Sequence, residues 1–358
     1  MNKNKLYKMY ISIWQYLGDI QRRKDCIKFA KENTKISLDK DKKEEVKNYW
    51  KRYCKVNTVF HDFYYEKSGC FDVKYIPDDL YYTKIDTFYN DWNAAKIVDN
   101  KCYYENLFSV NKSVRHPNTF IRRINGKWLD ANWKLIDINK VINILNYSNA
   151  FFLKLATQSE GGKGVFYLDK SENDYIDKFI NIVNNVSNDL VIQEPLSQCK
   201  SLAMLNKESI NTIRILTLLR NNNVKVYSSI LRMGVNNSKI DNASSGGITC
   251  GINENGYLKS VAYSANGDSF GRHPSSGICF TNVHVPGYQE AVELVKELHP
   301  IIPDFQLVSW DIAIDKFEKP VLVEVNLKYG ELDFHQLNNG PLFGDDTKEI
   351  LDEVFKKN

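Results

Sequence analysis

The chain has 358 residues, of which 43% are hydrophobic and 26% are charged, and its formal net charge is +4. A chain of this length and composition can bury a large core, and its size predicts two or three lobes. It has no apolar run long enough to span a membrane, and its start (MNKNKLYKMY) lacks the apolar segment of a signal peptide, so we expect no integral membrane segment.

Cysteine usage favours a reducing compartment. The seven cysteines include no Cys-x-x-Cys pair, and their number is odd. This pattern indicates free thiols rather than a disulfide framework or a zinc site. We therefore expect a cytoplasmic protein.

Positive charge is concentrated at the amino-terminal end. Residues 1–56 contain sixteen Lys and Arg against seven Asp and Glu, whereas the rest of the chain is net acidic. Apolar residues recur at helical spacing within 5–17 and 41–56, which predicts amphipathic helices. Such a segment can contact nucleic acid or anionic lipid. No recognition motif accompanies it, so we interpret it as a solvated helical face and expect no nucleic-acid partner.

An aromatic-rich stretch follows at residues 60–92. Its pattern favours irregular chain with short extended pieces, and we expect its aromatic rings to pack in a core rather than to stack on bases. Residues 1–95 are thus expected to form a mainly helical region in front of the main fold.

From about residue 95 the periodicities of strands and helices alternate, which predicts an α/β fold. A Gly-rich turn joins the first two strands of this part, and the loop Asn-Asn-Asn joins a later hairpin. The predicted elements are strands at 150–156 and 164–168, a helix at 173–186, a strand at 189–196, a hairpin of 211–220 and 223–234, a helix at 288–300, and a strand pair within 306–330.

The last strand pair carries an acid in each strand. Asp311 and Glu324 stand where buried strands normally hold apolar residues, and a turn near Phe317 places their Cβ atoms about 5 Å apart. Two carboxylates that close repel unless a cation lies between them. Mg2+ prefers carboxylate and amide oxygens, and Asn326 offers an amide on the face of Glu324. The alternative is a solvent-facing polar side of an edge hairpin.

A lysine beside a glycine turn is a second candidate feature. Lys154 lies at the end of an apolar strand, and Gly161, Gly162 and Gly164 follow it. Glycines let backbone N–H groups approach phosphate oxygens closely. The turn has neither the Walker A pattern nor the Rossmann fingerprint, so a glycine hairpin without a ligand is the alternative.

A third feature is the segment VIQEPLSQ at residues 191–198, which ends a buried strand at Glu194 and Leu196. Where a chain leaves a sheet, its backbone groups are open to hydrogen bonds and can read the edge of an adenine ring. An ordinary strand end has the same pattern.

In this order the three features resemble the ATP-grasp superfamily, and more narrowly the sugar-transfer-associated ATP-grasp family. The resemblance extends over roughly residues 70–345. The segments that carry it are NTIRILT (211–217), NASSGGITCGI (242–252), GRHPSSG (271–277), VPGYQEAVELV (285–295) and the SWDIAI…KPVLVEVN hairpin (309–326).

The resemblance implies an ATP-grasp fold of the α/β (α+β) class, in which two lobes clamp ATP together with Mg2+. The smaller lobe is expected at residues 96–200 and the larger at 201–358. The nucleotide-binding residues that the resemblance implies are Lys101, Lys154, Gly161, Gly162, Gly164, Glu194, Leu196 and Asn242. The Mg2+ ligands that it implies are Asp311, Glu324 and Asn326.

The chain departs from related D-alanine–D-alanine ligases at one arginine. These ligases carry an arginine two residues before the metal-binding Asp, and here that place is Ser309. Arg214, Arg232 and Arg272 are therefore the candidates for stabilising an acyl phosphate, and Arg214 matches the basic residue on the strand that faces the phosphates. Glu208 is a candidate for the ribose-binding acid.

The resemblance further implies the chemistry. A carboxylate attacks the γ-phosphate of ATP to give an acyl phosphate and ADP, and an amine then displaces phosphate to form an amide. Lys154 and Arg214 are expected to neutralise the developing charge. His273 is expected either to act on the acceptor as a general base or to be a structural histidine before Pro274.

The link to sugar transfer implies small-molecule, sugar-linked acid and amine substrates of surface-polysaccharide synthesis, with glycosyltransferases as partners. Two alternatives stay open: a small-molecule kinase built on the same fold, and a non-catalytic ATP-binding partner of glycosyltransferases.

Overall fold

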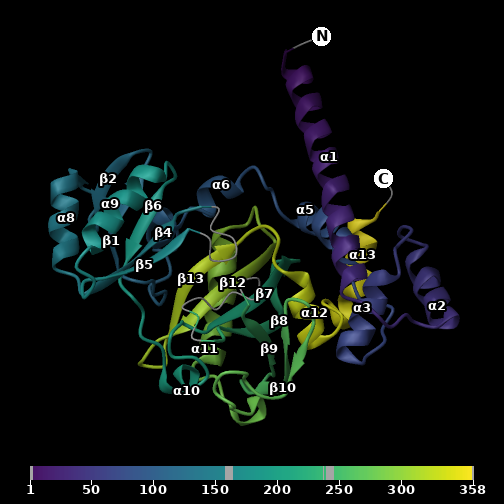
Figure 1. The fold of residues 1–358 in the computed structure, drawn as a ribbon. Coiled ribbons are helices and arrows are strands. Elements are labelled where there is room, and N and C mark those ends of the chain that lie inside the picture. Colours follow the sequence, from purple (N-terminus) through teal and green to yellow (C-terminus); the bar gives the residue numbers. More distant parts are fainter. Residues whose placement is uncertain (1–2, 158–163, 237, 239–245, 357–358) are drawn as a thin grey trace.

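Two antiparallel sheets form the framework of the molecule (Figure 1). The computed structural model describes residues 3–157, 164–236, 238 and 246–356. The first sheet has the strand order β3-β2-β1-β6-β4-β5. Its strands are β1 (Thr119–Ile124), β2 (Lys127–Asp130), β3 (Leu135–Ile136), β4 (Ala150–Leu155), β5 (Val165–Asp169) and β6 (Leu190–Gln193).

The second sheet has the strand order β11-β10-β9-β8-β7-β12-β13. Its strands are β7 (Thr212–Arg220), β8 (Asn223–Met233), β9 (Ile248–Ile252), β10 (Leu258–Ser264), β11 (Ser269–Phe270), β12 (Leu307–Ile314) and β13 (Pro320–Asn326). With helices on both sheets, these strands confirm the predicted α/β class.

Helices cover the sheets and form the amino-terminal region. The α-helices of that region are α1 (Lys3–Glu32), α2 (Lys40–Trp50), α3 (Val59–Ser68), α4 (Asp78–Leu80), α5 (Asp86–Tyr89), α6 (Ala95–Val98) and α7 (Tyr104–Leu107). The later ones are α8 (Ile138–Asn146), α9 (Tyr175–Asn185), α10 (Lys200–Ala203), α11 (Tyr288–Leu298), α12 (Leu332–Asn339) and α13 (Thr347–Val354). Shorter turns are the π-helix η1 (Tyr81–Ile85) and the 3-10 helices η2 (Lys101–Tyr103), η5 (Phe280–Asn282), η6 (His299–Ile301) and η7 (Gly344–Asp346).

The cores lie where the helices meet the sheets. Helices α8 and α9 bury Val141 and Phe179 against the first sheet. Helix α11 buries Val295 in the large core of the second sheet, together with Trp310 of β12. Helix α12 contacts β8, β9 and β10. In the second sheet, β12, which lies between β7 and the edge strand β13, is buried at every residue.

The hairpin of β7 and β8 follows the prediction closely. Asn221 and Asn222 both have positive φ angles, 52° and 58°. Asparagine tolerates this left-handed conformation better than most residues, and two such residues in succession make the tight turn that matches strand twist. The predicted strands and helices at 150–156, 164–168, 173–186 and 288–300 are likewise confirmed as β4, β5, α9 and α11.

The interpretation of residues 60–92 as irregular and partly extended was wrong, because this stretch is mostly helical. Phe60, Phe63 and Tyr64 recur at helical spacing and bury one face of α3. Gly69 ends that helix in the left-handed conformation at φ 74°. Aromatic residues are common in strands as well, so composition misled where spacing would have identified the helix.

The helical character predicted for the first 60 residues is confirmed. The amino-terminal half of α1 projects away from the body of the molecule, while its other end packs beside α3 and α4 (Figure 1). In the part of the chain that the structure describes, no helix has the length and apolar character needed to cross a bilayer.

Candidate functional site

The two acids of the last hairpin lie opposite each other, as predicted. In the pairing of β12 with β13, Asp311 faces Glu324 and Ser309 faces Asn326, so these side chains share one side of the sheet. The hairpin includes the edge strand β13. Asp311 lies on the other strand, β12, and is only 2% exposed. The polar side of this hairpin is therefore covered at Asp311, which disfavours the solvent-facing alternative.

Two arginines from neighbouring strands hold Asp311. Arg214 on β7 is the register partner of Asp311 and donates two hydrogen bonds of 2.7 Å, from Nε to Oδ1 and from Nη2 to Oδ2. Arg232 on β8 donates from Nη1 to Oδ2 at 2.8 Å. All three residues are buried, so these strands bring together two of the three arginine candidates around the predicted metal acid.

The electrostatics of this cluster follow from its contacts. Burial by itself raises the pKa of Asp311, but the guanidinium groups of Arg214 and Arg232 outweigh burial and lower that pKa to about 2. Burial lowers the pKa of Arg214, and its carboxylate neighbours, Asp311 first, more than reverse this shift. The carboxylate of Asp311 is therefore ionised at neutral pH.

Lys101 joins the two sheets at this site. Its Nζ donates to Oε1 of Glu324 at 2.6 Å, while its backbone N–H donates to the carbonyl of Ala156 just after β4 at 2.9 Å. The turn η2 that carries Lys101 is capped by Asn100, whose side chain accepts from the N–H of Cys102. One residue thus ties the end of a first-sheet strand to the predicted metal acid of the second sheet.

The structure places the other predicted phosphate-binding residues on the first sheet. Lys154 on β4 donates from Nζ to Oε1 of Gln193 on β6 at 3.1 Å. Gly164 has a φ of +77°, and a Cβ there would lie 2.4 Å from the side chain of Leu155, so this position requires glycine. Three predicted residues, Gly161, Gly162 and Asn242, lie outside the described residues.

Glu194 and Leu196 leave the first sheet directly after β6, as predicted. The N–H of Glu194 donates to the carbonyl of Asn118 at 2.9 Å, and its carboxylate accepts from Asn118 Nδ2 at 3.3 Å. Glu194 is exposed and Leu196 half-buried. Neither residue contacts the Asp311 cluster among the described residues.

His273 is buried, and its contacts favour the structural alternative. Its Nε2 lies 3.1 Å from the carbonyl of Gly234, and Nδ1 accepts from the N–H groups of Ser275 and Ser276 at 3.3 Å. Burial lowers the pKa of His273. Both ring nitrogens are therefore engaged by the backbone. The third arginine candidate, Arg272, is exposed and donates to the carbonyl of Gly277 at 3.2 Å, away from Asp311.

Glu331 is a site residue that the sequence analysis missed. It accepts a hydrogen bond from Nη1 of Arg214 and so shares this guanidinium with Asp311. Glu331 lies in the connection between β13 and α12, where no strand or helix period marks an acid.

A second group of carboxylates lies behind Glu331. Tyr64 donates from its hydroxyl to Oδ1 of Asp78 at 2.6 Å. Burial, and next the charge of Asp333, raise the pKa of Asp78 well above its usual range. Burial, and next the charge of Glu331, raise the pKa of Asp333 to about 7. Asp78 and Asp333, near Glu331, therefore ionise at a higher pH than ordinary aspartates do.

Asp333→Asn is expected to stabilise the fold at alkaline pH. Since the folded-state pKa of about 7 lies above the ordinary 3.8, ionising Asp333 costs stability as pH rises through this window. The variant should be more stable than wild type at pH 8 by on the order of 1 kcal/mol or more, and this advantage should disappear towards pH 4. Denaturant unfolding at pH 5 and pH 8 measures it, with the exposed acid Asp304→Asn as control. An equal stability difference at both pH values would contradict the expectation.

The residues present fit a hard divalent cation such as Mg2+ by their donor chemistry. Glu324 gives one oxygen to Lys101, and Oε2 has no hydrogen-bond partner among the described residues. Asn326 donates its amide N–H to the carbonyl of Ser309 at 3.2 Å, which leaves its Oδ1 for a cation. No group of three or more His, Cys, Asp or Glu suited to a metal occurs within the described ranges, so the predicted set relies on an amide oxygen and on sharing Asp311 with the arginines.

Comparison with known proteins identifies a family that matches most of this chain. The family described as sugar-transfer associated ATP-grasp matches residues 81–350. The search of curated proteins found no match.

Several solved structures are similar to this chain. The ADP complex of N5-carboxyaminoimidazole ribonucleotide synthetase is 12% identical, with a TM-score of 0.39, and the match covers 64% of this chain and 45% of that one. D-alanyl-alanine synthetase A from Vibrio cholerae is 10% identical, with a TM-score of 0.43 and coverage of 72% and 66%. The D-Ala:D-Ser ligase VanG from Enterococcus faecalis is 12% identical, with a TM-score of 0.41 and coverage of 75% and 63%. The chain spans less than two thirds of the length of each.

Proposed function

Because the chain belongs to the sugar-transfer associated ATP-grasp family, we propose that it is an ATP- and Mg2+-dependent ligase that joins a carboxylate to an amine. The observation that carries the proposal is the ion pair between Lys101 and Glu324, set beside Asp311 and its two arginines. This arrangement places one cation from η2, beside the first sheet, and two from the second sheet around one pair of acids. Charge of this kind is what the transfer of a phosphoryl group requires.

In this proposal the first sheet belongs to the smaller lobe (96–200) and the second sheet to the larger lobe (201–358). Lys101 and Lys154 bind phosphate oxygens, and the segment after β6 reads the adenine. The full set proposed for the nucleotide is Lys101, Lys154, Gly161, Gly162, Gly164, Glu194, Leu196 and Asn242.

Asp311, Glu324 and Asn326 would hold Mg2+, which when bound neutralises the phosphates and orients them. A carboxylate oxygen of the acid attacks the γ-phosphorus of ATP and ADP leaves, giving an acyl phosphate. The amine nitrogen then attacks the acyl carbon, inorganic phosphate leaves, and the nitrogen loses a proton to give the amide. Arg214 and Arg232 are the proposed stabilisers of the acyl phosphate, since both are fixed beside Asp311. We propose no catalytic role for His273.

The substrates belong to the same proposal. Two of the similar solved structures are named for joining amino acids, so a small carboxylate and a small amine are the classes to test first. The family's name associates it with sugar transfer, which favours a sugar-linked acid such as a uronic acid. We therefore place the chain in cytoplasmic synthesis of surface-polysaccharide precursors, alongside glycosyltransferases.

The test is whether ADP release needs both substrates. Wild-type protein with Mg2+ and ATP is incubated with pairs of uronic acids and amino acids, and ADP and inorganic phosphate are measured. A ligase releases the two in equal amounts, and only when acid and amine are both present. Phosphate retained on the acceptor would instead identify a kinase. Tight ATP binding without turnover on any pair would favour the non-catalytic partner.

A further inference from the structure

The connection between β13 and α12 is held in an unusual backbone conformation. Tyr329 and Glu331 have positive φ angles of 55° and 57°, although neither is glycine. A bulky residue in this left-handed region costs free energy and persists only where surrounding contacts offset the cost. The contacts around residues 327–332 must therefore hold this conformation in place.

On the inner side, this connection is locked to the arginine cluster. Glu331 accepts from Arg214, which in turn holds Asp311. The carbonyl of Gly330 accepts from Ser309 Oγ at 3.3 Å, and a Cβ at Gly330 would lie 2.7 Å from that same oxygen. The conformation of the connection thus decides where Glu331 meets Arg214.

On the outer side, the connection is held by the amino-terminal helical region. The N–H of Tyr329 donates to Oδ2 of Asp86 at 2.9 Å, and the N–H of Leu332 donates to the hydroxyl of Tyr82 at 3.3 Å. The ring of Trp92 meets the ring of Tyr329 edge-on, with centroids 4.9 Å apart. These contacts enclose the tyrosine ring from the side of α5 and η1.

Arg22 of α1 makes a further contact with the Tyr329 ring. The guanidinium of Arg22 lies 4.0 Å from the centre of the Tyr329 ring and 6.0 Å from that of Tyr82. Such cation–π contacts are favourable, and more so when they are shielded from water. Arg22 is half-buried and makes no ion pair within the described part of the chain. Its described contacts are therefore the cation–π contacts with these two rings.

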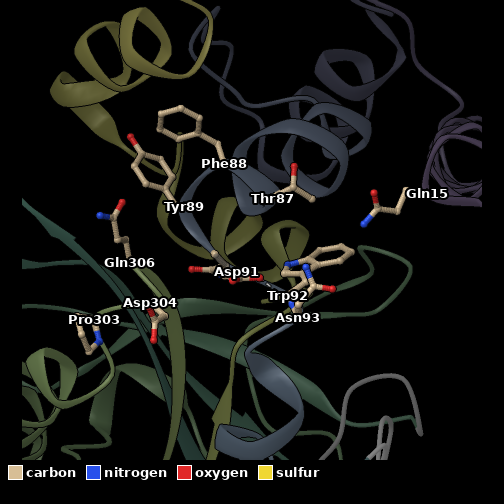
Figure 2. A pocket seen from close by; sticks show the side chains of 11 residues that line it. Gln15, Thr87, Phe88, Tyr89, Asp91, Trp92, Asn93, Pro303, Asp304 and Gln306 are labelled. Carbon is tan, nitrogen blue, oxygen red and sulfur yellow. Dashed lines mark hydrogen bonds between the residues drawn. The ribbon is translucent and has the colours of Figure 1, made fainter. Parts of the chain in front are cut away.

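A cavity beside Trp92 separates part of α1 from the segment of residues 87–93. A cavity of about 560 Å3 is lined by Gln15 of α1 on one side and by Thr87, Trp92 and Asn93 on the other. Figure 2 shows Gln15 set apart from these residues across the opening. Two turns later, at Arg22, the helix reaches Tyr329. Among the α1 side chains that the structure describes, from Gln15 onwards, Arg22 is thus the one that reaches Tyr329.

We propose that Arg22 is a positioning residue of the ligase site: by stacking on Tyr329 it holds the connection that sets Glu331 against Arg214, and so orients Asp311. The inference deepens the proposed function and rests on it. It gives the amino-terminal helix, which lies outside the matched family range, a role in binding Mg2+ and ATP.

The test is a Mg2+ titration of ATP binding by calorimetry on the full chain. Arg22→Ala is expected to raise the Mg2+ concentration for half-maximal ATP binding about three- to tenfold, the range that the loss of one cation–π contact predicts. Arg22→Lys should lie between wild type and Arg22→Ala. Lys24→Ala removes a positive charge from the same helix at an exposed side chain, so this control should bind as wild type does. Melting temperatures confirm that each variant is folded.

A second variant tests the route. If Arg22 acts through Glu331, adding Arg22→Ala to Glu331→Gln should cause no further change in the Mg2+ dependence, whereas additive losses would overturn the route. Wild-type Mg2+ dependence in Arg22→Ala, with Glu324→Gln defective, would overturn the inference and leave the proposed function intact. No ATP binding by wild type would overturn both. Equal defects in Arg22→Ala and Lys24→Ala would show a general effect of the helix and overturn the positioning role.

Discussion

Glu324→Gln is expected to reduce Mg2+-dependent ATP turnover by at least about a hundredfold, because it removes the charge that both Lys101 and the proposed cation require. The side chain of Glu324 is 26% exposed, but that of Lys101 is only 7% exposed, so the isosteric amide leaves the buried ammonium group without the charge of this partner. Gln can still accept the hydrogen bond of Lys101. Because this hydrogen bond is retained but the charge is lost, the variant should be less stable than wild type by about 1–3 kcal/mol.

The measurement is ADP release under saturating ATP, together with calorimetric binding of ATP at several Mg2+ concentrations. The matched control is Glu290→Gln, since Glu290 also pairs with a lysine, Lys319, at 2.9 Å, but both side chains are more than half exposed. That variant should retain wild-type turnover. If Glu324→Gln turned over ATP at the wild-type rate, the proposed metal role of Glu324 would be wrong.

Asp311→Asn is expected to destabilise the fold as well as to stop turnover. The carboxylate is 2% exposed and neutralises Arg214 and Arg232 at 2.7 and 2.8 Å. Removing one partner of a buried ion pair leaves buried charge uncompensated and costs about 3 kcal/mol. Because Arg214 keeps Glu331 as a partner, we expect the low end of the range known for such changes.

Denaturant unfolding measures this loss, and Asp315→Asn, directly after the same strand, is its control. The side chain of Asp315 is also buried, at 8% exposed, but its partner Arg115, at 2.6 Å, is 45% exposed. Water can therefore solvate the guanidinium when the carboxylate is lost, and Asn can still accept the backbone hydrogen bonds of Asp315, so the cost should be smaller, about 1 kcal/mol. The unfolding free energy at acid pH gives a second measurement. The folded-state pKa of Asp311 is about 2, below the ordinary 3.8, so its stabilisation is complete above pH 4 and is lost as pH falls towards 2. Asp311→Asn should lose less stability than wild type over that interval; equal losses would contradict this account.

Sequence alone determined the class of the fold, its family and the acidic hairpin. Period-two patterns and the asparagine turn identified β7 and β8, and the same alternation placed Asp311 opposite Glu324, as the strand register confirms. The family predicted from these motifs matches residues 81–350. These features are local, because a strand's period and a turn's chemistry depend on neighbouring residues. The roles proposed for the nucleotide and metal residues stay predictions.

Only the tertiary structure decided how the acids are balanced and what holds them. Arg232 reaches Asp311 from two strands away, and Lys101 reaches Glu324 from 223 residues earlier in the chain. Glu331 and Arg22 lie where no periodicity marks them, and their contacts form only when the helical region packs beside the second sheet. The charge balance of a buried site depends on which residues the fold brings within a few ångströms, and sequence spacing carries no record of that proximity.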